Sequence, residues 1–538
     1  MIFTTLQLPV WCFILLGFLP WSLLFVLIFL AHRQTFRMLG IVDVIVLLCV
    51  ATTLFPSLEY ASNLLIIPDS VEAVVGAERI LALGRYDIAI GDSIYPPLYP
   101  LGFSLFVVLP AFVVFGTSSL GNPIFAIWAL ATLGPLMTYL TLKKFFSVDV
   151  ALIGVTLVLV IPGYREFAQQ IVSPLPAAGM TAAAVYFYCL VKGSPDSKIL
   201  KLIFGITIML ATACRSLSAL LVLPAFLSFD IRRDKKDIAL ILIAVVVLTI
   251  GTLLYNLHVF GTPVRTGYNF WAPIPHDYFY ITFGTRYLLD NLDALVSGGF
   301  PIYLALSSVG IMSVKKGLRL RLALTVAAAI LPPIIFHLFY FFQSPVYFIP
   351  ALIILSPLAA LGTAAIARRL LSQQGVTIFA YSSLFVVLLV SLSVERPPNL
   401  RSQVAKAATE VVPKDAIFIT GIDPVFLEPT FTRGTNRRVV PVSRNVEYAS
   451  KVIAPQKLEM LVRPKNNWWE HRTPELLAAG AIDPVPKTAL EQLDHLREEV
   501  NGGRRLFVEL VFVDLEALNL IQGKFKISSI NNFIAELQ

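Results

Sequence analysis

The sequence predicts an α-helical polytopic membrane protein with a soluble α/β domain at its C-terminal end. Of the 538 residues 57% are hydrophobic and 14% are charged, whereas ordinary soluble domains carry about 25% charged residues. Apolar segments long enough to cross a bilayer recur along the first 396 residues. Residues 395–538 hold 37 of the 76 formal charges. The chain therefore divides into a membrane domain, residues 1–396, and a soluble domain, residues 397–538.

The membrane domain is expected to cross the bilayer about eleven to thirteen times, because a crossing helix needs about 20 residues. Arg215 interrupts one long apolar segment, which favours two short helices there. The first segment has no basic region before it and no small-residue cleavage site after it, so it is expected to be a retained span. The candidate spans are 8–31, 39–56, 97–116, 123–142, 149–163, 173–191, 202–229, 238–256, 300–314, 322–340, 346–367 and 375–394.

Basic residues gather in short loops between the apolar segments, as they do on the cytoplasmic side of membrane proteins. With these loops in the cytoplasm, the large loops at about 57–97 and 257–299 and the soluble domain are extracytoplasmic. Lys143-Lys144 follows the first large loop by two apolar segments, so either these lysines are extracytoplasmic or one segment does not cross. The loops are marked by His32, Arg33 and Arg37; by Lys192, Lys198 and Lys201; by Arg232, Arg233, Lys235 and Lys236; by Lys315 to Arg321; and by Arg368-Arg369.

Composition also limits the partners of the chain. The net charge of +8 is explained by contact with an anionic lipid surface, and no nucleic-acid partner is expected. The four cysteines all lie in apolar segments, so they indicate neither a disulfide framework nor a thiolate metal site. The six histidines show no metal-ligand spacing.

The soluble domain has the pattern of an α/β fold. Three apolar runs, 416–420, 438–442 and 506–513, are typical of buried strands. Segments 401–412 and 488–500 have helical spacing. With more than 140 residues, this part of the chain is long enough to bury a core of its own.

Asp69 is the candidate for chemistry in the first large loop. A carboxylate at the boundary of a low-dielectric region has a raised pKa and becomes a better base. If a helix starts near residue 70, Asp69, Glu72 and Arg79 lie roughly on one face of it. The structural alternative is that Asp69 caps this helix beside Ser70, with the remaining charges forming a solvated face.

Four motifs occur in order along the membrane domain. Asp69 is followed by an Ala/Leu-rich stretch, by Gly84-Arg85-Tyr86 and by Tyr95-Pro96-Pro97-Leu98-Tyr99. The others are Thr212-Ala213-Cys214-Arg215-Ser216, the segment 255–268 with Asn256, Phe260-Gly261, Pro263 and Gly267-Tyr268, and Gln343-Ser344-Pro345-Val346-Tyr347-Phe348-Ile349-Pro350. Together they resemble the GT-C superfamily of polytopic glycosyltransferases. The resemblance covers residues 40–395 and is to the branch that includes aminoarabinose transferases, protein O-mannosyltransferases and Rgt-type sugar transferases.

This resemblance implies a GT-C-like membrane domain that acts as an inverting glycosyltransferase, with its active site and soluble domain outside the cytoplasm, in a bacterial inner (plasma) membrane. The donor would be a polyprenyl-phosphate-linked sugar and the acceptor a lipid, glycan or protein. Asp69 would be the catalytic base, deprotonating the acceptor hydroxyl. No cofactor is expected and no metal motif is visible, although a divalent ion held by Asp69 and a loop carboxylate stays open. The candidate substrate-binding residues are Glu72, Arg85, Tyr95, Arg165, Glu166, Arg215, Arg265, Tyr268, His276 and Arg286.

The sequence departs from the family pattern at several positions. Ser70 follows Asp69 where an acid is frequent, Ser173 stands where a second acid is frequent, Val346 replaces an arginine, and Tyr95 replaces a basic residue. Arg215 is therefore either a phosphate ligand or a structural partner of a broken helix, since a charge in an apolar span needs pairing. Arg165, in the short loop 162–172, is alternatively a solvated anchor, and Tyr268 is alternatively part of an interfacial aromatic belt.

The sequence leaves two other functions open. A transporter or flippase for lipid-linked glycans would need polar residues along several spans and often shows internal repeats, but the spans are mostly apolar and no repeat is visible. A catalytically inactive GT-C relative, acting as a scaffold or lipid-binding subunit, is consistent with the replaced acids. An assay with a labelled polyprenyl-phosphate sugar separates it from the enzyme.

Overall fold

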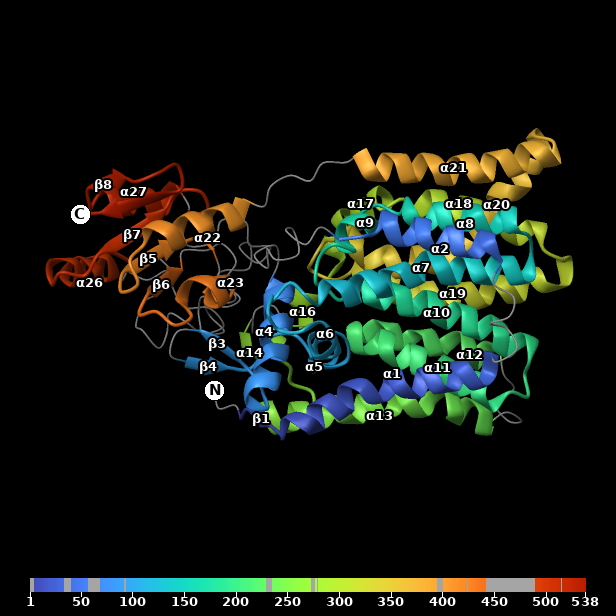
Figure 1. Cartoon of the computed structure of the whole chain (residues 1–538), viewed down its shortest axis with the longest axis horizontal. Helices are drawn as coiled ribbons and strands as arrows, with labels where there is room; N and C mark the ends of the chain where they lie inside the picture. The colour runs from blue at the N-terminus through green and yellow to red at the C-terminus, as the bar shows by residue number, and fades with distance from the viewer. Residues whose placement is uncertain are drawn as a thin grey trace.

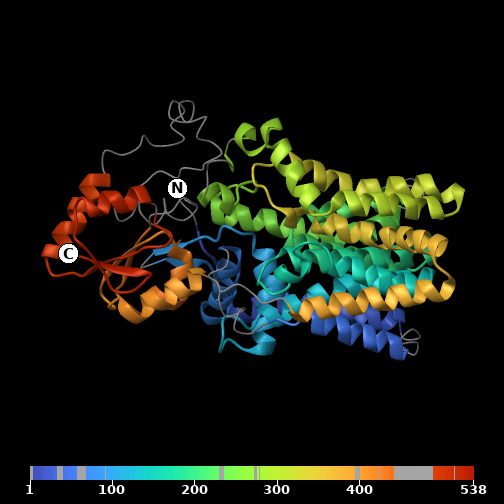
Figure 2. The ribbon, with the colours of Figure 1, turned by 90° about the horizontal axis from the view of Figure 1, so that it is seen from above.

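The structure is a computed structural model of the whole chain. It describes residues 4–32, 40–56, 68–90, 93–228, 235–271, 276–277, 279–393, 400–422, 424–441, 489–513 and 515–538. Long helices run side by side in one bundle, and a smaller α/β domain lies beyond one end of that bundle (Figure 1). The view from above keeps this division (Figure 2). The expected membrane domain and C-terminal α/β domain are thus both present as separate parts of the fold.

The bundle is built from apolar helices of unequal length. Seven described helices are long and apolar enough to cross a membrane, or up to eight if the bent pair Thr285–Ser297 and Phe300–Ser313 counts as one span. Shorter apolar helices lie at Ile41–Thr53, Leu101–Phe115, Val148–Leu159 and Ser216–Leu227. The bundle helices are α1 (Val10–His32), α2 (Ile41–Thr53), α7 (Ile124–Phe145), α8 (Val148–Leu159), α10 (Pro174–Gly193), α11 (Lys198–Cys214), α12 (Leu223–Ser228), α13 (Lys235–Phe260), α18 (Phe300–Ser313), α19 (Lys316–Leu338), α20 (Ile349–Leu370) and α21 (Gln373–Ser393).

Polar pairs mark the end of the bundle away from the α/β domain. The Lys143 ammonium at the end of α7 lies 2.6 Å from the Asp43 carboxylate at the start of α2. Lys201 near the start of α11 pairs with Asp237 at the start of α13 at 2.7 Å. Helix α7 therefore ends where α2 begins. This end of the bundle carries basic residues, Lys201 among them, that the sequence assigns to the cytoplasm.

The position of Lys143 decides between the two alternatives for segment 97–116. This segment forms α5 (Leu101–Phe103), the π-helical turn η3 (Ser104–Val108) and α6 (Leu109–Phe115). The Phe115 carbonyl accepts a hydrogen bond from Asn122, just before α7 begins, and the other end of the segment is bound to helix α4 (Pro68–Leu83) near Asp69. Both ends thus lie on the Asp69 side of the bundle, so the expectation that 97–116 crosses is wrong. The π-turn in its middle makes it too short and irregular for a span.

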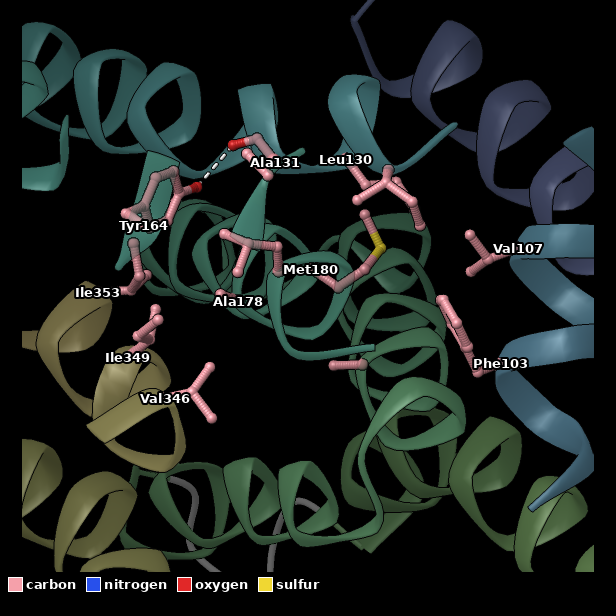
Figure 3. Close-up of a cluster of buried hydrophobic side chains, with 14 of the residues drawn as sticks. Phe103, Val107, Leu130, Ala131, Tyr164, Ala178, Met180, Val346, Ile349 and Ile353 are labelled. Atoms are coloured by element: carbon pink, nitrogen blue, oxygen red, sulfur yellow. Dashed lines mark hydrogen bonds between the residues drawn. The ribbon is translucent and has the colours of Figure 1, made fainter. Parts of the chain in front are cut away.

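The core of the bundle depends on close packing of small residues and apolar side chains. A Cβ atom on Gly310 in α18 would lie 2.0 Å from the Leu358 carbonyl oxygen in α20, and one on Gly362 would lie 1.9 Å from the Leu306 oxygen. Such close approach is typical of helices packed in membranes. Figure 3 shows a central part of the core, where the Tyr164 hydroxyl donates to the Ala131 carbonyl at 2.6 Å. This buried hydroxyl is thus satisfied inside the bundle.

Short elements cover the bundle end that faces the α/β domain. Helix α4 (Pro68–Leu83) precedes two small antiparallel ribbons, β1 (Leu6–Gln7) with β2 (Arg85–Tyr86), and β3 (Ile88–Ile90) with β4 (Ser93–Tyr95). The helix expected near residue 70 is therefore present. The other short elements at this end are α9 (Tyr164–Phe167), η4 (Ser216–Val222), α14 (Gly267–Trp271), α16 (Phe279–Thr282), η5 (Thr285–Tyr287), α17 (Leu288–Ser297) and η6 (Pro345–Phe348).

The C-terminal domain contains a five-stranded sheet in the order β6-β5-β7-β9-β8. Strand β5 pairs in parallel with β6 and β7, whereas β9 pairs antiparallel with β7 and β8. The three predicted strands are present, but β7 ends at Glu509, so the prediction of a strand through residue 513 is too long. The elements are α22 (Leu400–Val411), β5 (Ile417–Thr420), α23 (Pro424–Leu427), η7 (Glu428–Thr432), β6 (Arg438–Pro441), α26 (Ala489–Asn501), β7 (Leu506–Glu509), α27 (Leu515–Gln522), β8 (Ile527–Ser529) and β9 (Ile534–Leu537).

The chain beyond β7 turns around a buried carboxylate. Glu509 accepts hydrogen bonds from the backbone amides of Gly421 at 2.8 Å and of Val511 at 2.8 Å. Phe512 donates its amide to the same carboxylate at 2.9 Å. These bonds replace the ladder bonds of a longer strand, which explains why β7 stops here. Strands β8 and β9 were not predicted from the sequence.

Candidate functional site

Asp69 lies in the first turn of α4, at the bundle end that faces the C-terminal domain. Its side chain is half-buried. Burial raises the pKa of the Asp69 carboxyl above its usual range, while a hydrogen bond from the Tyr99 hydroxyl and the nearby positive charge of Arg215 act in the opposite direction. Two groups from other parts of the chain therefore act on Asp69, Tyr99 through a hydrogen bond and Arg215 through its charge. A carboxylate in such surroundings is suited to accept a proton.

Glu72 binds the segment that returns from the first large loop. Its side chain is buried, and its carboxylate accepts hydrogen bonds from the backbone amides of Leu98 and Tyr99. The Tyr99 bond measures 2.9 Å. This contact fixes Tyr99 next to Asp69, one helical turn away on α4. Glu72, a candidate for substrate binding, thus also has a structural task.

The third sequence motif packs directly on the first. A Cβ atom on Gly267 would lie 2.1 Å from the Pro97 carbonyl oxygen, so only glycine allows this approach without a shift. The Trp271 indole donates to the Pro96 carbonyl at 2.7 Å, and the Tyr95 ring lies 5.1 Å from the Trp271 ring. Tyr95 is buried in this contact. The Pro-Pro segment is therefore clamped between α4 on one side and α14 on the other.

Arg215 lies where α11 ends. The helix stops at Cys214 and the 3-10 helix η4 begins at Ser216, so the predicted break is confirmed. The guanidinium of Arg215 stacks on the Tyr347 ring at 4.6 Å, and its Nη1 atom is buried with no hydrogen-bond partner among the residues that the structure describes. Tyr347 stacks in turn on His337, with 4.3 Å between ring centroids. An arginine held by ring stacking keeps its donors available for an anion.

Arg215, His337 and Tyr347 border a pocket between α10, η4, α19 and α20. The pocket is small, with a cavity volume of about 30 Å3. Its remaining walls are largely apolar and include Leu221 and Ile334. Asp69 does not line this pocket, but its carboxyl lies within electrostatic reach of Arg215. We define this group, Asp69, Tyr99, Arg215 and Tyr347 with the pocket, as the Asp69 site.

Tyr268 and His276 extend the Asp69 site toward the second large loop. The Tyr268 ring packs edge-on against Tyr99 at 5.7 Å, and the His276 ring lies 5.0 Å from Tyr268. Burial lowers the pKa of His276 to about 4, against an opposing effect of Asp277. His276 is therefore a neutral imidazole at neutral pH. Arg215 thus acts on Asp69 directly, and Glu72, Tyr268 and His276 are linked to it through Tyr99. Tyr95 packs on Trp271 beside the Pro-Pro segment.

Arg265 and Arg286 belong to the same large loop. Arg265 pairs with Asp277 at 3.5 Å. Arg286 donates to the Tyr280 carbonyl at 2.7 Å and stacks on Tyr287 at 4.8 Å. These contacts hold both arginines within their own loop. Their expected part in substrate binding stays a prediction.

Arg85 takes part in a cluster of charges with Arg79 of α4 and Asp87. Asp87 is fully buried and is bound by Arg79, with Arg85 3.4 Å away. This cluster joins α4 to the ribbon that follows it, and it is separate from the groups that contact Asp69. The expected part of Arg85 in substrate binding stays a prediction.

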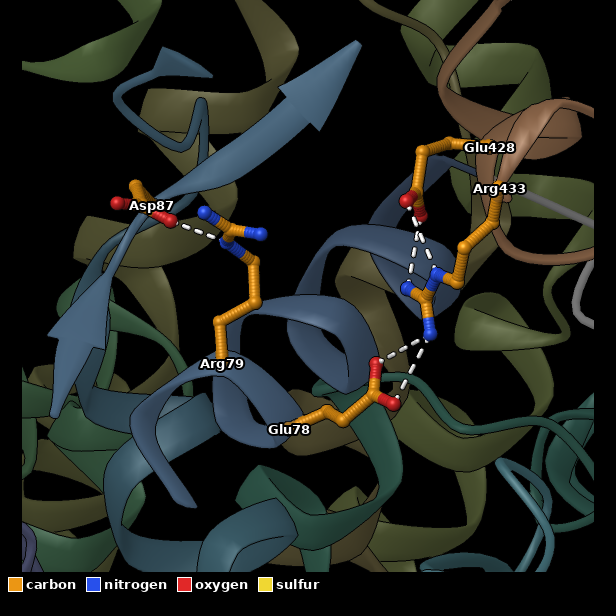
Figure 4. A network of polar contacts seen from close by, with 5 residues as sticks. All are labelled: Glu78, Arg79, Asp87, Glu428 and Arg433. Carbon is orange, nitrogen blue, oxygen red and sulfur yellow. Dashed lines mark hydrogen bonds and ion pairs between the residues drawn. The ribbon is translucent and has the colours of Figure 1, made fainter. Parts of the chain in front are cut away.

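Helix α4 is also tied to the C-terminal domain. Glu78 of α4 pairs with Arg433 at 2.9 Å, and Arg433 also binds Glu428 at 2.9 Å (Figure 4). The three residues form a bridge between the helix that carries Asp69 and the α/β domain. No local sequence pattern predicts this bridge, because Glu78 and Arg433 are 355 residues apart in the sequence.

Arg165 and Glu166 lie apart from the Asp69 site. Both belong to the short helix α9, where Glu166 is exposed and Arg165 is half-buried. Arg165 borders a different pocket, formed with the end of α2 and with Trp128 of α7. The two pockets share no lining residue. Within the described parts of the chain, no three His, Cys, Asp or Glu side chains come together as metal ligands.

Two residues of this region were not among the candidates from the sequence. Tyr99 closes the Pro-Pro motif and binds Asp69, and His337 stands behind Tyr347. His337 is a lone polar residue near the end of an apolar helix, which is a signal of function in membrane proteins. Tyr99 had the weaker signal of its place in the motif.

Comparison with known proteins establishes the fold. No protein-family model matches the sequence, and a search of curated protein sequences finds no match. Among solved structures, the chain is similar to ArnT from Cupriavidus metallidurans bound to undecaprenyl phosphate. The TM-score is 0.56 and the identity 13%, over 92% of this chain and 97% of that one. The apo structure of the same protein matches with a TM-score of 0.56 and 12% identity over the same shares. The chain thus has an ArnT-like fold of helical membrane bundle and small C-terminal domain, as the GT-C resemblance predicts.

Proposed function

We propose that this chain is an integral membrane glycosyltransferase. It transfers a sugar, with inversion, from a polyprenyl-phosphate-linked donor to an extracytoplasmic lipid, glycan or protein, in a bacterial inner membrane. The observation that carries the proposal is the meeting of four distant motifs around one carboxylate. Asp69 is bound by Tyr99 and lies near Arg215, and Arg215 stacks on Tyr347 at the border of an apolar pocket.

The arrangement supports a simple division of tasks. Asp69 accepts the proton of the acceptor hydroxyl, whose oxygen then attacks the anomeric carbon of the donor sugar. The bond between that carbon and the phosphate oxygen breaks, and its electron pair leaves with the polyprenyl phosphate. Arg215 stabilises the charge that develops on this phosphate, because its buried Nη1 atom has no other partner in the described parts of the chain. The lipid chain runs past the apolar residues that border the pocket, Leu221 and Ile334 among them.

The ArnT-like fold adds independent support for the donor class. That protein's structure holds undecaprenyl phosphate, which is the leaving group that the proposed reaction would release. Its identity to this chain is 13%, so the proposed residue roles depend on the geometry around Asp69. The sugar and the acceptor are left general because the described residues around Asp69 do not select one.

The proposal is tested in two steps on the purified protein in lipid nanodiscs. First, undecaprenyl phosphate is titrated into wild type, Asp69→Asn and Arg215→Ala, and binding is measured by the thermal shift. We expect wild type and Asp69→Asn to bind and Arg215→Ala to bind much more weakly. Second, release of undecaprenyl phosphate from labelled undecaprenyl-phosphate sugars is followed with cell-envelope extract as acceptor. Asp69→Asn should lose this release, and full activity in that variant would refute the role of Asp69.

The same experiment separates the enzyme from an inactive relative. A lipid-binding subunit without activity would bind undecaprenyl phosphate in the first step and release none in the second, for wild type as well as for Asp69→Asn. A flippase, reconstituted into vesicles, would move a labelled lipid across the bilayer without cleaving it. Undecaprenyl phosphate that does not bind to wild type at all would contradict the proposed donor class.

A further inference from the structure

The residues that line the second pocket of the bundle have no role in the proposed reaction. It lies between the end of α2, the first turns of α7 and the short helix α9, and its cavity volume is about 410 Å3. Its walls are Leu48, Ala51, Phe55 and Trp128, and its polar groups are Thr52, Thr53 and Arg165. An apolar hollow with one cation and two hydroxyl-bearing residues is a site for an amphipathic anion.

Arg165 supplies the charge at this pocket. The Nε atom of Arg165 is buried and has no hydrogen-bond partner within the described ranges of the chain. A buried donor without a partner is costly, and arginine is suited to bind phosphate through two parallel hydrogen bonds. Arg165 follows Gly163, whose positive φ of 78° turns the chain from α8 into α9. The turn holds Arg165 beside the end of α2 and not in the Asp69 site.

The other walls open toward the outer surface of the bundle. Leu48 is 60% exposed and Phe55 is 50% exposed. Trp128 is fixed by its own contacts, since its indole donates to the Ala51 carbonyl at 2.9 Å and its ring meets Phe55 edge-on at 5.4 Å. A tryptophan and an arginine at the end of the bundle are typical of head-group depth in a membrane. The pocket is thus accessible from the lipid side.

The surface of α2 continues the pocket as an apolar track. Ile41, Val44, Ile45 and Leu48 are all exposed and follow the helical spacing of one face. An acyl chain can lie along this face while its head group reaches Arg165. Free phosphate would contact the Arg165 charge but neither the apolar walls of the pocket nor the track on α2. The polyprenyl phosphate of the proposed donor would belong to the Arg215 pocket, which shares no lining residue with this one.

We propose that the pocket at Arg165 binds the phosphate diester of a membrane glycerophospholipid, with the Arg165 guanidinium on the phosphate and an acyl chain along α2. The proposal is independent of the function proposed for the Asp69 site. It assigns to Arg165 a task in lipid binding that differs from its expected contact with the donor. The lipid stabilises the junction of α2, α7 and α9, because it joins groups from all three.

The test is lipid binding to the purified full chain, measured by native mass spectrometry with phosphatidylglycerol and with diacylglycerol as the lipid without phosphate. We expect wild type to retain phosphatidylglycerol and Arg165→Gln to bind it about tenfold more weakly, the factor expected for loss of one charge-assisted contact. Lys144→Gln removes the same charge at the exposed opposite end of α7 and should bind as wild type. Diacylglycerol should not distinguish the variants.

A second variant keeps the test independent of the charge. Thr52 is exposed, so Thr52→Trp fills the pocket without disturbing the core, whereas Leu254→Trp adds a tryptophan at an exposed position of α13, outside both the pocket and the track. Thr52→Trp should lose phosphatidylglycerol and Leu254→Trp should keep it. Unchanged binding in both Arg165→Gln and Thr52→Trp would overturn the proposal. Displacement by millimolar inorganic phosphate would instead identify a free-anion site, and displacement by undecaprenyl phosphate a donor site, and either would overturn it too.

Discussion

Arg215 and Arg165 are two half-buried arginines at the same end of one bundle, and their surroundings differ in a way that separates chemistry from lipid contact. Arg215 stands at a break in a helix, stacks on Tyr347 and lies near a carboxylate whose pKa is raised by burial. Arg165 stands on a surface helix beside Leu48 and Phe55, both at least half exposed. Under the two proposals the same side chain serves two tasks, and the two sites differ in whether a base lies within reach of the arginine.

We expect the largest effect on transfer from replacing each arginine in turn. Arg215→Ala should lower transfer by about 100- to 1,000-fold, as loss of one group that stabilises developing charge does in other enzymes. Arg165→Ala should change the turnover number by less than about threefold, because its pocket is separate from the Asp69 site. The measurement is release of polyprenyl phosphate at saturating donor. Equal losses in both variants would contradict the division between the two pockets.

The next largest effect is expected on stability, from substitution of a glycine. Gly267→Ala puts a Cβ atom 2.1 Å from the Pro97 carbonyl oxygen, and overpacking of this kind costs about 1–3 kcal/mol. Gly251→Ala in α13 is the matched control, since a Cβ atom there meets no described atom within 4 Å. The first change should lower the thermal unfolding temperature in detergent, and the second should leave it unchanged. Phosphatidylglycerol binding at Arg165 should stay as in wild type for both, because Gly267 belongs to the Asp69 side.

Much of the fold was predictable because it depends on local composition. The apolar segments, the charged C-terminal domain and the break at Arg215 follow from residues that are neighbours in the sequence. The sequence left the topology near Lys143 open, and the pair that bears on it joins Lys143 to Asp43, 100 residues away in the sequence. A buried carboxylate needs a cation, and Lys143 was the cation whose side of the membrane was open.

The site was predictable in its parts and not in its contacts. Asp69 and Arg215 stand out as charges next to or within apolar segments. The contact of Glu72 with the Leu98 and Tyr99 amides spans 26 and 27 residues, and no local pattern specifies it. The approach of Gly267 to Pro97 joins two loops that are distant in the sequence. Such contacts arise from tertiary packing, so a single sequence predicts the chemistry of a residue better than its partner.

Tyr99 allows a smaller and more specific change at the Asp69 side. The Tyr99 hydroxyl lowers the pKa of Asp69 against the raising effect of burial, so Tyr99→Phe should raise that pKa further. A base acts in its ionised form, so activity is lost as pH falls through the pKa of Asp69. The acidic limb of the pH–rate profile should therefore move to higher pH in Tyr99→Phe. Glu78→Gln, a charge change on the same helix whose partner is Arg433, should leave the limb in place.

The bridge from α4 to the C-terminal domain should give the smallest effect. Glu78 and Arg433 are paired at 2.9 Å with side chains 25% and 38% exposed, and a pair so accessible to water contributes about 0.5–1 kcal/mol. A double-mutant cycle of Glu78→Gln and Arg433→Gln should give a coupling energy of that size in thermal or denaturant unfolding. Because α4 carries Asp69, the single variants should lower transfer modestly while binding at the Arg165 pocket stays unchanged. A coupling energy near zero, with transfer intact, would mean that the C-terminal domain rests on α4 without influencing the Asp69 site.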